Sequence, residues 1–172
     1  MVTEYKEAKM SEKLNVEEVE ERIKCSREMI EHEALMFYSI FDEARKAGLD
    51  FEEVLREAVR SCSYYEGKDI ASACTNIDDL KVFGESFADE FWSAIHDMEI
   101  LEAEKDKLKI NFHSCAYVDA WKKIGVSQED MKLLCDVLMD GDRCIAKSLN
   151  YKFVLGKTIA EGNPVCELDF NK

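Results

Sequence analysis

Residues that break regular structure are scarce in this chain, which has one proline, Pro164, and seven glycines among 172 residues. Proline removes a backbone donor and glycine loosens the backbone, so long stretches without either favour helices. The chain is long enough for one well-buried core, and no low-complexity linker divides it. We therefore expect one domain over residues 1–172, with a polar, frayed N-terminus over 1–14.

Positive charge is also scarce, because 23 Lys and Arg stand against 37 Asp and Glu, a formal net charge of -14. Such a surface repels a phosphate backbone or an anionic membrane. The N-terminus lacks the pattern of a secretory signal, and no apolar run approaches bilayer-spanning length. We expect a cytoplasmic protein whose partner is a small molecule, with no nucleic acid and no membrane; a homo-oligomer stays open.

Motifs of several common enzyme classes are missing. The sequence has no glycine-rich phosphate loop, no Gly-x-Ser-x-Gly elbow and no His-Glu-x-x-His. These absences remove the most common enzyme classes.

Helical spacing dominates the first two thirds of the chain. Asn15 followed by Glu18 predicts a capping box, and the apolar residues after it recur at helical intervals as far as Gly48. Asp50 predicts the start of a second helix that fades near Gly67. Asn76 then predicts the cap of a third helix, whose aromatic stripe we interpret as core: Leu80, Phe83, Phe87, Phe91, Ile95 and Met98.

The period changes in the last third, where apolar and polar residues alternate over 108–112 as in a half-buried strand. Short helices are predicted over 117–124 and after a Ser127 cap, and two more strands over 151–155 and 165–170. The pattern predicts an α+β fold: a helical N-terminal half followed by a small antiparallel sheet with short helices packed on it.

Seven cysteines, an odd number without a secretory signal, indicate reduced thiols. The last four lack the short Cys-x-x-Cys pairs of structural zinc sites: Cys115, Cys135, Cys144 and Cys166. The predicted strands and helices allow Cys115, Cys135 and Cys166 to converge at one end of the sheet. His113 would face the same side as Cys115 if the strand continued that far. The alternative is that the thiols only pack as small hydrophobic groups and the histidine lies at the surface.

Asp140, Asp142 and Arg143 fall near a predicted helix end beside these thiols. Gly141-Asp142 is either a solvated turn or supplies a carboxylate that acts as general base or metal ligand.

These residues resemble a known family. The matching positions are Phe112-x-x-Cys115 before an Ala-Trp helix, Leu134-Cys135 followed by an acid, and Lys157-Thr158-x-x-x-Gly162-x-x-x-Cys166 before an apolar strand. Over residues 108–172 this pattern is similar to the L-2-amino-thiazoline-4-carboxylic acid hydrolase family. Over the helical part only the general pattern agrees.

The resemblance implies a hydrolase that opens a small cyclic thiazoline or amidine-like substrate at a carbon-nitrogen or carbon-sulfur bond, giving a carbamoyl-cysteine product. It implies catalytic roles for Cys115, Cys135, Cys166 and Asp140 or Asp142, and leaves Cys144 as packing. Relatives often have proline directly after the first cysteine, where this chain has alanine.

The implied reaction needs a nucleophile or base, for which Cys115 and Asp142 are the candidates. The substrate carboxylate needs a cation, and Arg143 is preferred over Lys157 because its guanidinium forms a fork. His113 and Thr158 complete the expected substrate-binding set.

Two other functions stay open. The helical half and cysteine-closed sheet also look like the small-molecule-binding domains named after vinyl reductase, which predicts a sensor of a small molecule or metal without turnover. The third function is a helical interaction protein whose cysteines only pack. The sequence requires no cofactor and leaves a divalent metal open.

Overall fold

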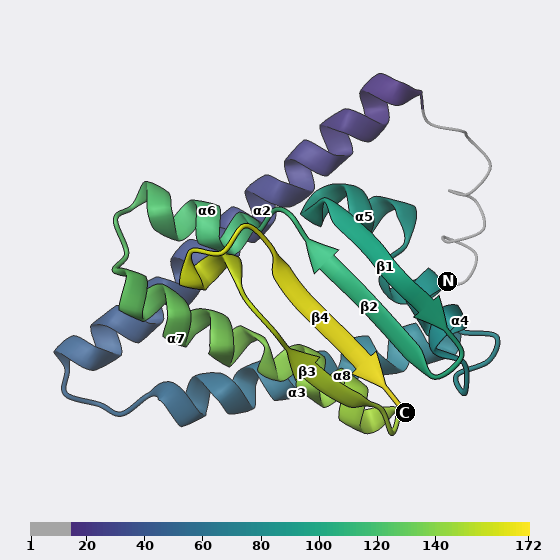
Figure 1. The fold of residues 1–172 in the computed structure, drawn as a ribbon. Helices are drawn as coiled ribbons and strands as arrows, with labels where there is room; N and C mark the ends of the chain where they lie inside the picture. The colour runs from purple at the N-terminus through teal and green to yellow at the C-terminus, as the bar shows by residue number, and fades with distance from the viewer. Residues whose placement is uncertain (1–14) are drawn as a thin grey trace, which may run out of the picture.

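The computed structural model describes residues 15–172 and has the predicted α+β fold (Figure 1). A helical half precedes a four-stranded antiparallel sheet, and short helices follow within the sheet half. The elements are α2 (Val16–Lys46), α3 (Glu52–Ala73), α4 (Leu80–Phe87), α5 (Glu90–His96), β1 (Met98–Glu104), β2 (Lys107–Phe112), α6 (Ala116–Lys123), α7 (Gln128–Leu138), α8 (Asp140–Ser148), β3 (Lys152–Leu155), the 3-10 turn η1 (Ile159–Glu161) and β4 (Cys166–Asn171). The expectation for residues 1–14 lies outside the described residues.

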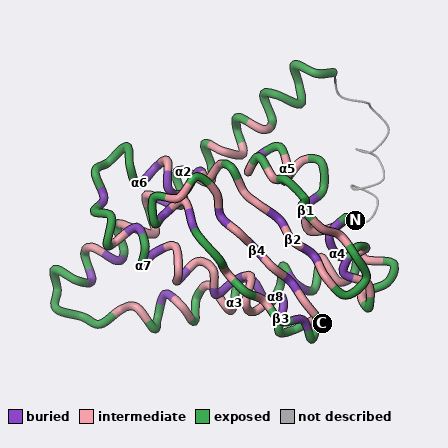
Figure 2. The backbone as a smooth tube through the Cα atoms, in the orientation of Figure 1, coloured by how far each residue is buried: buried purple, intermediate pink, exposed green. Residues whose placement is uncertain are grey.

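The sheet has the order β1-β2-β4-β3, with neighbouring strands antiparallel. In the central pair, Leu108 lies opposite Phe170 and Phe112 lies opposite Cys166. Burial alternates along both strands, so one face packs on the helices and the other is open to solvent (Figure 2). On the open face Lys109 lies 3.6 Å from Asp169, a polar pair of the kind that suits a solvated surface.

The long helix α2 begins at the predicted capping box, in which the Asn15 side chain accepts from the Glu18 amide. It ends before Gly48, whose φ of +72° fits the left-handed residue that closes many helices. In the middle of α2, the carbonyl of Ala34 accepts a 2.9 Å hydrogen bond from the buried indole of Trp121 on α6. This bond joins the helical half to α6, the helix that follows the central strand β2.

Helices α3 and α8 approach closely because small residues face each other where they cross. A Cβ added to Gly141 on α8 would lie 2.6 Å from the Ser63 hydroxyl on α3, and one added to Gly67 would lie 3.3 Å from the Ser148 hydroxyl. Gly67 therefore does not end the second helix as predicted. It lies inside α3, which continues to Ala73 because that glycine allows contact with α8.

Two apolar cores meet under the sheet. One joins α2, α3, α6 and α7 around Trp121 and Leu134, and the other joins the sheet to α4 and α8 around Phe83 and Phe170. Ile159 of η1 packs against both cores. The boundary between the cores, which we call the seam, is where the predicted thiols lie.

Further sequence expectations were wrong, among them the Asn76 cap, because Asp79 caps α4. The predicted third helix is two helices, because Asp89 caps α5 and Asp97, at φ 49°, ends it; strand β1 then follows. Asp50 is not the cap of α3, which begins after Phe51 without a side-chain cap. Asp140, Asp142 and Arg143 do fall near helix ends, between α7 and α8, but Gly141-Asp142 lies inside the first turn of α8 and is not a solvated turn.

Candidate functional site

The three thiols of the family pattern come together at the seam. Cys115 is the N-cap of α6 directly after β2, Cys135 lies on α7, and Cys166 begins β4. The charge of either neighbouring thiolate would raise the pKa of Cys135, so the three groups are within electrostatic reach of one another. The folded chain thus brings together positions that are far apart in sequence.

Burial keeps these thiols protonated at neutral pH. It raises the pKa of Cys135 to about 12 and of Cys166 to about 11, and also raises that of Cys115. Hydrogen bonds only partly oppose this effect: the Ile159 amide donates to Cys166 Sγ at 3.2 Å, and Thr158 interacts with Cys135. A thiol becomes a good nucleophile as the thiolate, so these groups are poorly prepared for attack.

Asp142 lies in the first turn of α8 and reaches the same seam. Burial raises the pKa of its carboxyl to about 7, and the nearby Glu66 carboxylate acts in the same direction, while Arg143 and the residue's own amide oppose both. The Asp142 charge would raise the pKa of Cys166, so the carboxyl lies within electrostatic range of that thiol. A carboxyl that titrates near neutral pH can both take and return a proton.

Asp140, two positions earlier, has different surroundings. Its carboxylate lies 2.7 Å from both Arg60 and Arg143, and 3.4 Å from Arg56. Burial alone would raise its pKa, but the hydrogen bonds from Arg143 and Arg60 outweigh burial and lower it. Asp136 on α7 belongs to the same network, 2.6 Å from Arg143 and 2.7 Å from Arg56. These acids are held ionised by arginines and join α3, α7 and α8.

A pocket of about 260 Å³ opens beside Cys135. Its walls come from α7, α8 and the segment between β3 and η1: Lys132, Cys135, Asp136, Arg143, Leu155, Gly156, Thr158 and Glu161. Three predicted site residues therefore share one pocket, namely Cys135, Arg143 and Thr158. The pocket is smaller than typical drug-sized sites and suits a small ligand.

Thr158 is fixed within this pocket wall. It is buried and caps η1, where its hydroxyl accepts from the Glu161 amide at 3.2 Å and its own amide donates to the Glu161 carboxylate at 3.2 Å. Gly162 closes the turn at φ +91°. This reciprocal cap sets the direction of both the Thr158 and Glu161 side chains.

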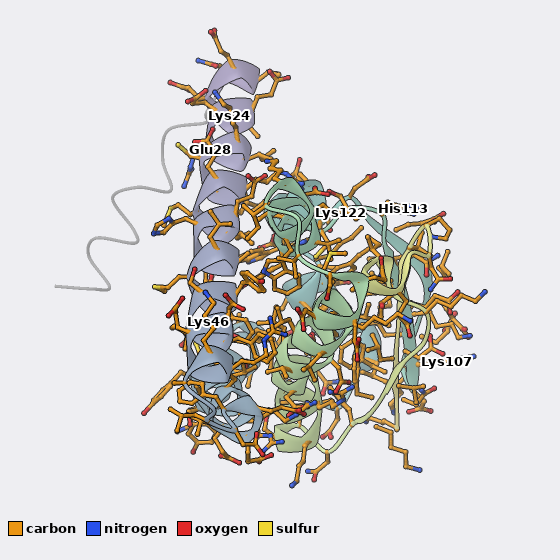
Figure 3. All side chains as sticks on the ribbon, turned by 90° about the vertical axis from the view of Figure 1, so that its left-hand side faces the viewer. Lys24, Glu28, Lys46, Lys107, His113 and Lys122 are labelled. Carbon is orange, nitrogen blue, oxygen red and sulfur yellow. The ribbon has the colours of Figure 1, made fainter. Side chains whose placement is uncertain are left out.

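His113 is the predicted site residue that the structure places apart from the thiols. Strand β2 ends at Phe112, so the extended geometry that would have aligned His113 with Cys115 does not occur. Its ring lies 3.0 Å from the Glu99 carboxylate on β1. Figure 3 shows His113 on the side of the molecule that carries the sheet, away from α2.

Sequence reasoning missed three polar groups near the seam, Tyr117, Glu33 and Glu66. Burial raises the pKa of Tyr117, and the nearby Glu33 and Cys115 charges would act in the same direction. Glu33 lies on α2 and Glu66 lies on α3. In the sequence, acidic residues of these helices resemble ordinary residues of a solvent-exposed helix face. No three His, Cys, Asp or Glu side chains within residues 15–172 are grouped so that they could hold a metal ion.

Comparisons with known proteins support a family and a fold. No curated protein matches the sequence. A trafficking protein particle complex subunit 3 from Naegleria fowleri, crystallised with covalently bound palmitic acid, has a similar fold: its TM-score is 0.52 at 12% identity, over 82% of this chain and 93% of that one. None of the described helices is long and apolar enough to cross a membrane. The model of the L-2-amino-thiazoline-4-carboxylic acid hydrolase family matches residues 27–170, so the chain belongs to that family.

Proposed function

We propose that this protein hydrolyses a small thiazoline-like ring, with Asp142 as the general base. Two findings support this proposal: the chain belongs to the hydrolase family, and burial raises the pKa of Asp142 to about 7. A general base works best when its pKa lies near the working pH. Asp140 is a poorer base, because arginines lower its pKa.

In the proposed step, Asp142 takes a proton from water while the water oxygen bonds to the ring carbon between nitrogen and sulfur. The new hydroxyl then forms the carbonyl of the product and releases its proton to water as the carbon-sulfur bond breaks, and the sulfur leaves as a thiol after receiving the proton held by the Asp142 carboxyl. The raised pKa values of Cys115, Cys135 and Cys166 favour neutral thiols that line the site over a thiolate nucleophile. Arg143 and Thr158 form part of the wall of the substrate pocket; Asp142 directly precedes Arg143 on α8 and does not itself line that pocket, so it acts through the attacking water, and His113 stays outside this proposal.

The direct test is incubation with 2-amino-thiazoline-4-carboxylic acid, followed by mass detection of a product heavier by one water. We expect turnover by the wild type and a loss of about 10²- to 10⁴-fold in kcat for Asp142→Asn. Asp106→Asn is the matched control, because Asp106 lies exposed in the turn between β1 and β2. Wild-type protein that forms no product, or Asp142→Asn with unchanged kcat, would contradict the proposal.

A second candidate is a binding module without turnover that carries an acyl chain on Cys115. Two observations favour it: Cys115 packs against the apolar helical core, and the protein of similar fold holds palmitic acid covalently. This candidate predicts an acyl adduct in the intact mass of the purified protein, released by hydroxylamine and absent from Cys115→Ala. Unmodified wild type that opens the ring would rule it out.

A further inference from the structure

The pocket beside Cys135 contains four charged side chains, and two of them neutralise each other. Arg143 lies 2.6 Å from Asp136 and uses its other contacts on Asp140 and the Asp136 carbonyl. Its fork is therefore already occupied by protein carboxylates. The cation that sequence reasoning preferred for a substrate carboxylate is part of the wall instead.

The other two charges, Lys132 and Glu161, have no such partner. Within residues 15–172 no carboxylate lies at ion-pair distance from Lys132, and no cationic side chain lies at that distance from Glu161. Both residues are exposed and line the same pocket. An unpaired positive and an unpaired negative group thus face one small volume.

The positions of the two charges are fixed by the fold. Lys132 lies one turn before Cys135 on the same face of α7. Glu161 is held by the Thr158 amide and hydroxyl, which both contact its Oε2 at 3.2 Å. Helix α7 contacts η1, and Gln128 on α7 donates to the Ala160 carbonyl, so the backbone of Lys132 is held beside that of Glu161.

We propose that Lys132 and Glu161 determine substrate specificity by binding the two ends of a dipolar substrate. Lys132 binds the carboxylate, and the free Oε1 of Glu161 binds the cationic nitrogen end of an amidine-like ring. This inference rests on the proposed hydrolase function and names the charges that its substrate must carry. Opposite charges placed on opposite ligand ends also fix the ligand's orientation.

Lys157 offers a matched control. It is exposed, lies 4.0 Å from Glu167 and does not line the pocket, although it is only four positions from Glu161. The sequence also suggested Lys157, as an alternative to Arg143, for binding the substrate carboxylate. A general loss of positive charge would affect Lys157→Glu and Lys132→Glu alike, whereas a specific contact affects only the latter.

The experiment measures KM and kcat of Lys132→Glu, Glu161→Lys and Lys157→Glu with the thiazoline acid and with its uncharged carboxamide. We expect Lys132→Glu to raise KM for the acid about tenfold, with little change in kcat and little effect on the carboxamide. Glu161→Lys should raise KM for both compounds, because both keep the cationic end. Lys157→Glu should behave as wild type.

Binding of the intact acid, measured by titration calorimetry, separates this inference from the hydrolase proposal. Binding that weakens in Lys132→Glu but without wild-type turnover supports the charge pair and contradicts the hydrolase. Turnover with an unchanged KM in Lys132→Glu overturns the charge pair and leaves the hydrolase standing. Wild type that neither binds nor opens the acid overturns both.

Discussion

Asp140 and Asp142 lie two positions apart in the first turn of α8, yet their pKa values shift in opposite directions. Side chains at such spacing point to different sides of a helix. Asp140 lies in a network of three arginines, whereas Asp142 has no ion-pair partner among the described residues and lies within electrostatic range of Glu66 and Cys166. Both share the same helix terminus, so their partners rather than the helix decide which carboxyl ionises easily.

The negative charges of the two aspartates therefore have opposite effects on the free energy of folding. The charge of Asp140 stabilises the fold because α3, α7 and α8 meet around it. The charge of Asp142 opposes folding because burial leaves it without a close cation that outweighs desolvation. Such a cost is typical of groups retained for chemistry.

The largest expected effect is a pH dependence of stability that belongs to Asp142. Its pKa is raised from 3.8 to about 7 in the folded protein, so its contribution is fully present below about pH 4 and is lost as pH rises to about 7. The corresponding decrease in the free energy of unfolding is roughly 4 kcal/mol at most. Urea unfolding of the wild type should show this decline, and Asp142→Asn should flatten it. A parallel decline in both proteins would contradict the assignment.

Asp140 should act in the opposite sense. Its pKa is lowered, so its stabilisation is present above the unfolded value of 3.8 and is lost as pH falls below it. Asp140→Asn should lower the free energy of unfolding by about 3 kcal/mol at neutral pH, because three arginines then lose a carboxylate partner. Asp142→Asn should be neutral or stabilising there. Equal urea midpoints for the two variants would remove the distinction between the sites.

Thiol reactivity should show a smaller contrast of the same kind. Cys25 is exposed on α2, whereas Cys115 and Cys166 lie in the seam with raised pKa values. Alkylation at neutral pH, followed peptide by peptide, should modify Cys25 first and leave the two seam thiols slow. Fast modification of Cys115 would indicate a lowered pKa and return it to the role of nucleophile.

The sequence predicted those elements whose signals are local. Asn15 and Ser127 cap α2 and α7 as their side chains suggested, and alternation located β2, β3 and β4. It also allowed three cysteines to converge at one end of the sheet. The caps and the strands depend on neighbours in the chain or on the periodicity of one strand.

What the sequence could not predict depends on contacts between distant segments. Gly141 resembles a turn residue, and its place inside α8 is explained only by the Ser63 hydroxyl of α3. Glu66 resembles a solvated acid until α3 brings it near Asp142. The choice between Asp140 and Asp142 likewise depended on the arginines of α3, such as Arg60, which lies 80 positions before Asp140.

The most direct test is a titration of the aspartate carboxyls by carbon-13 NMR, with Asp142→Asn and Asp140→Asn used to assign the two resonances. The account predicts that Asp142 titrates near pH 7 and that Asp140 titrates below its usual value of 3.8. Titration of both carboxyls near or below 3.8 would contradict the central claim that Asp142 is the acid-base group of the site.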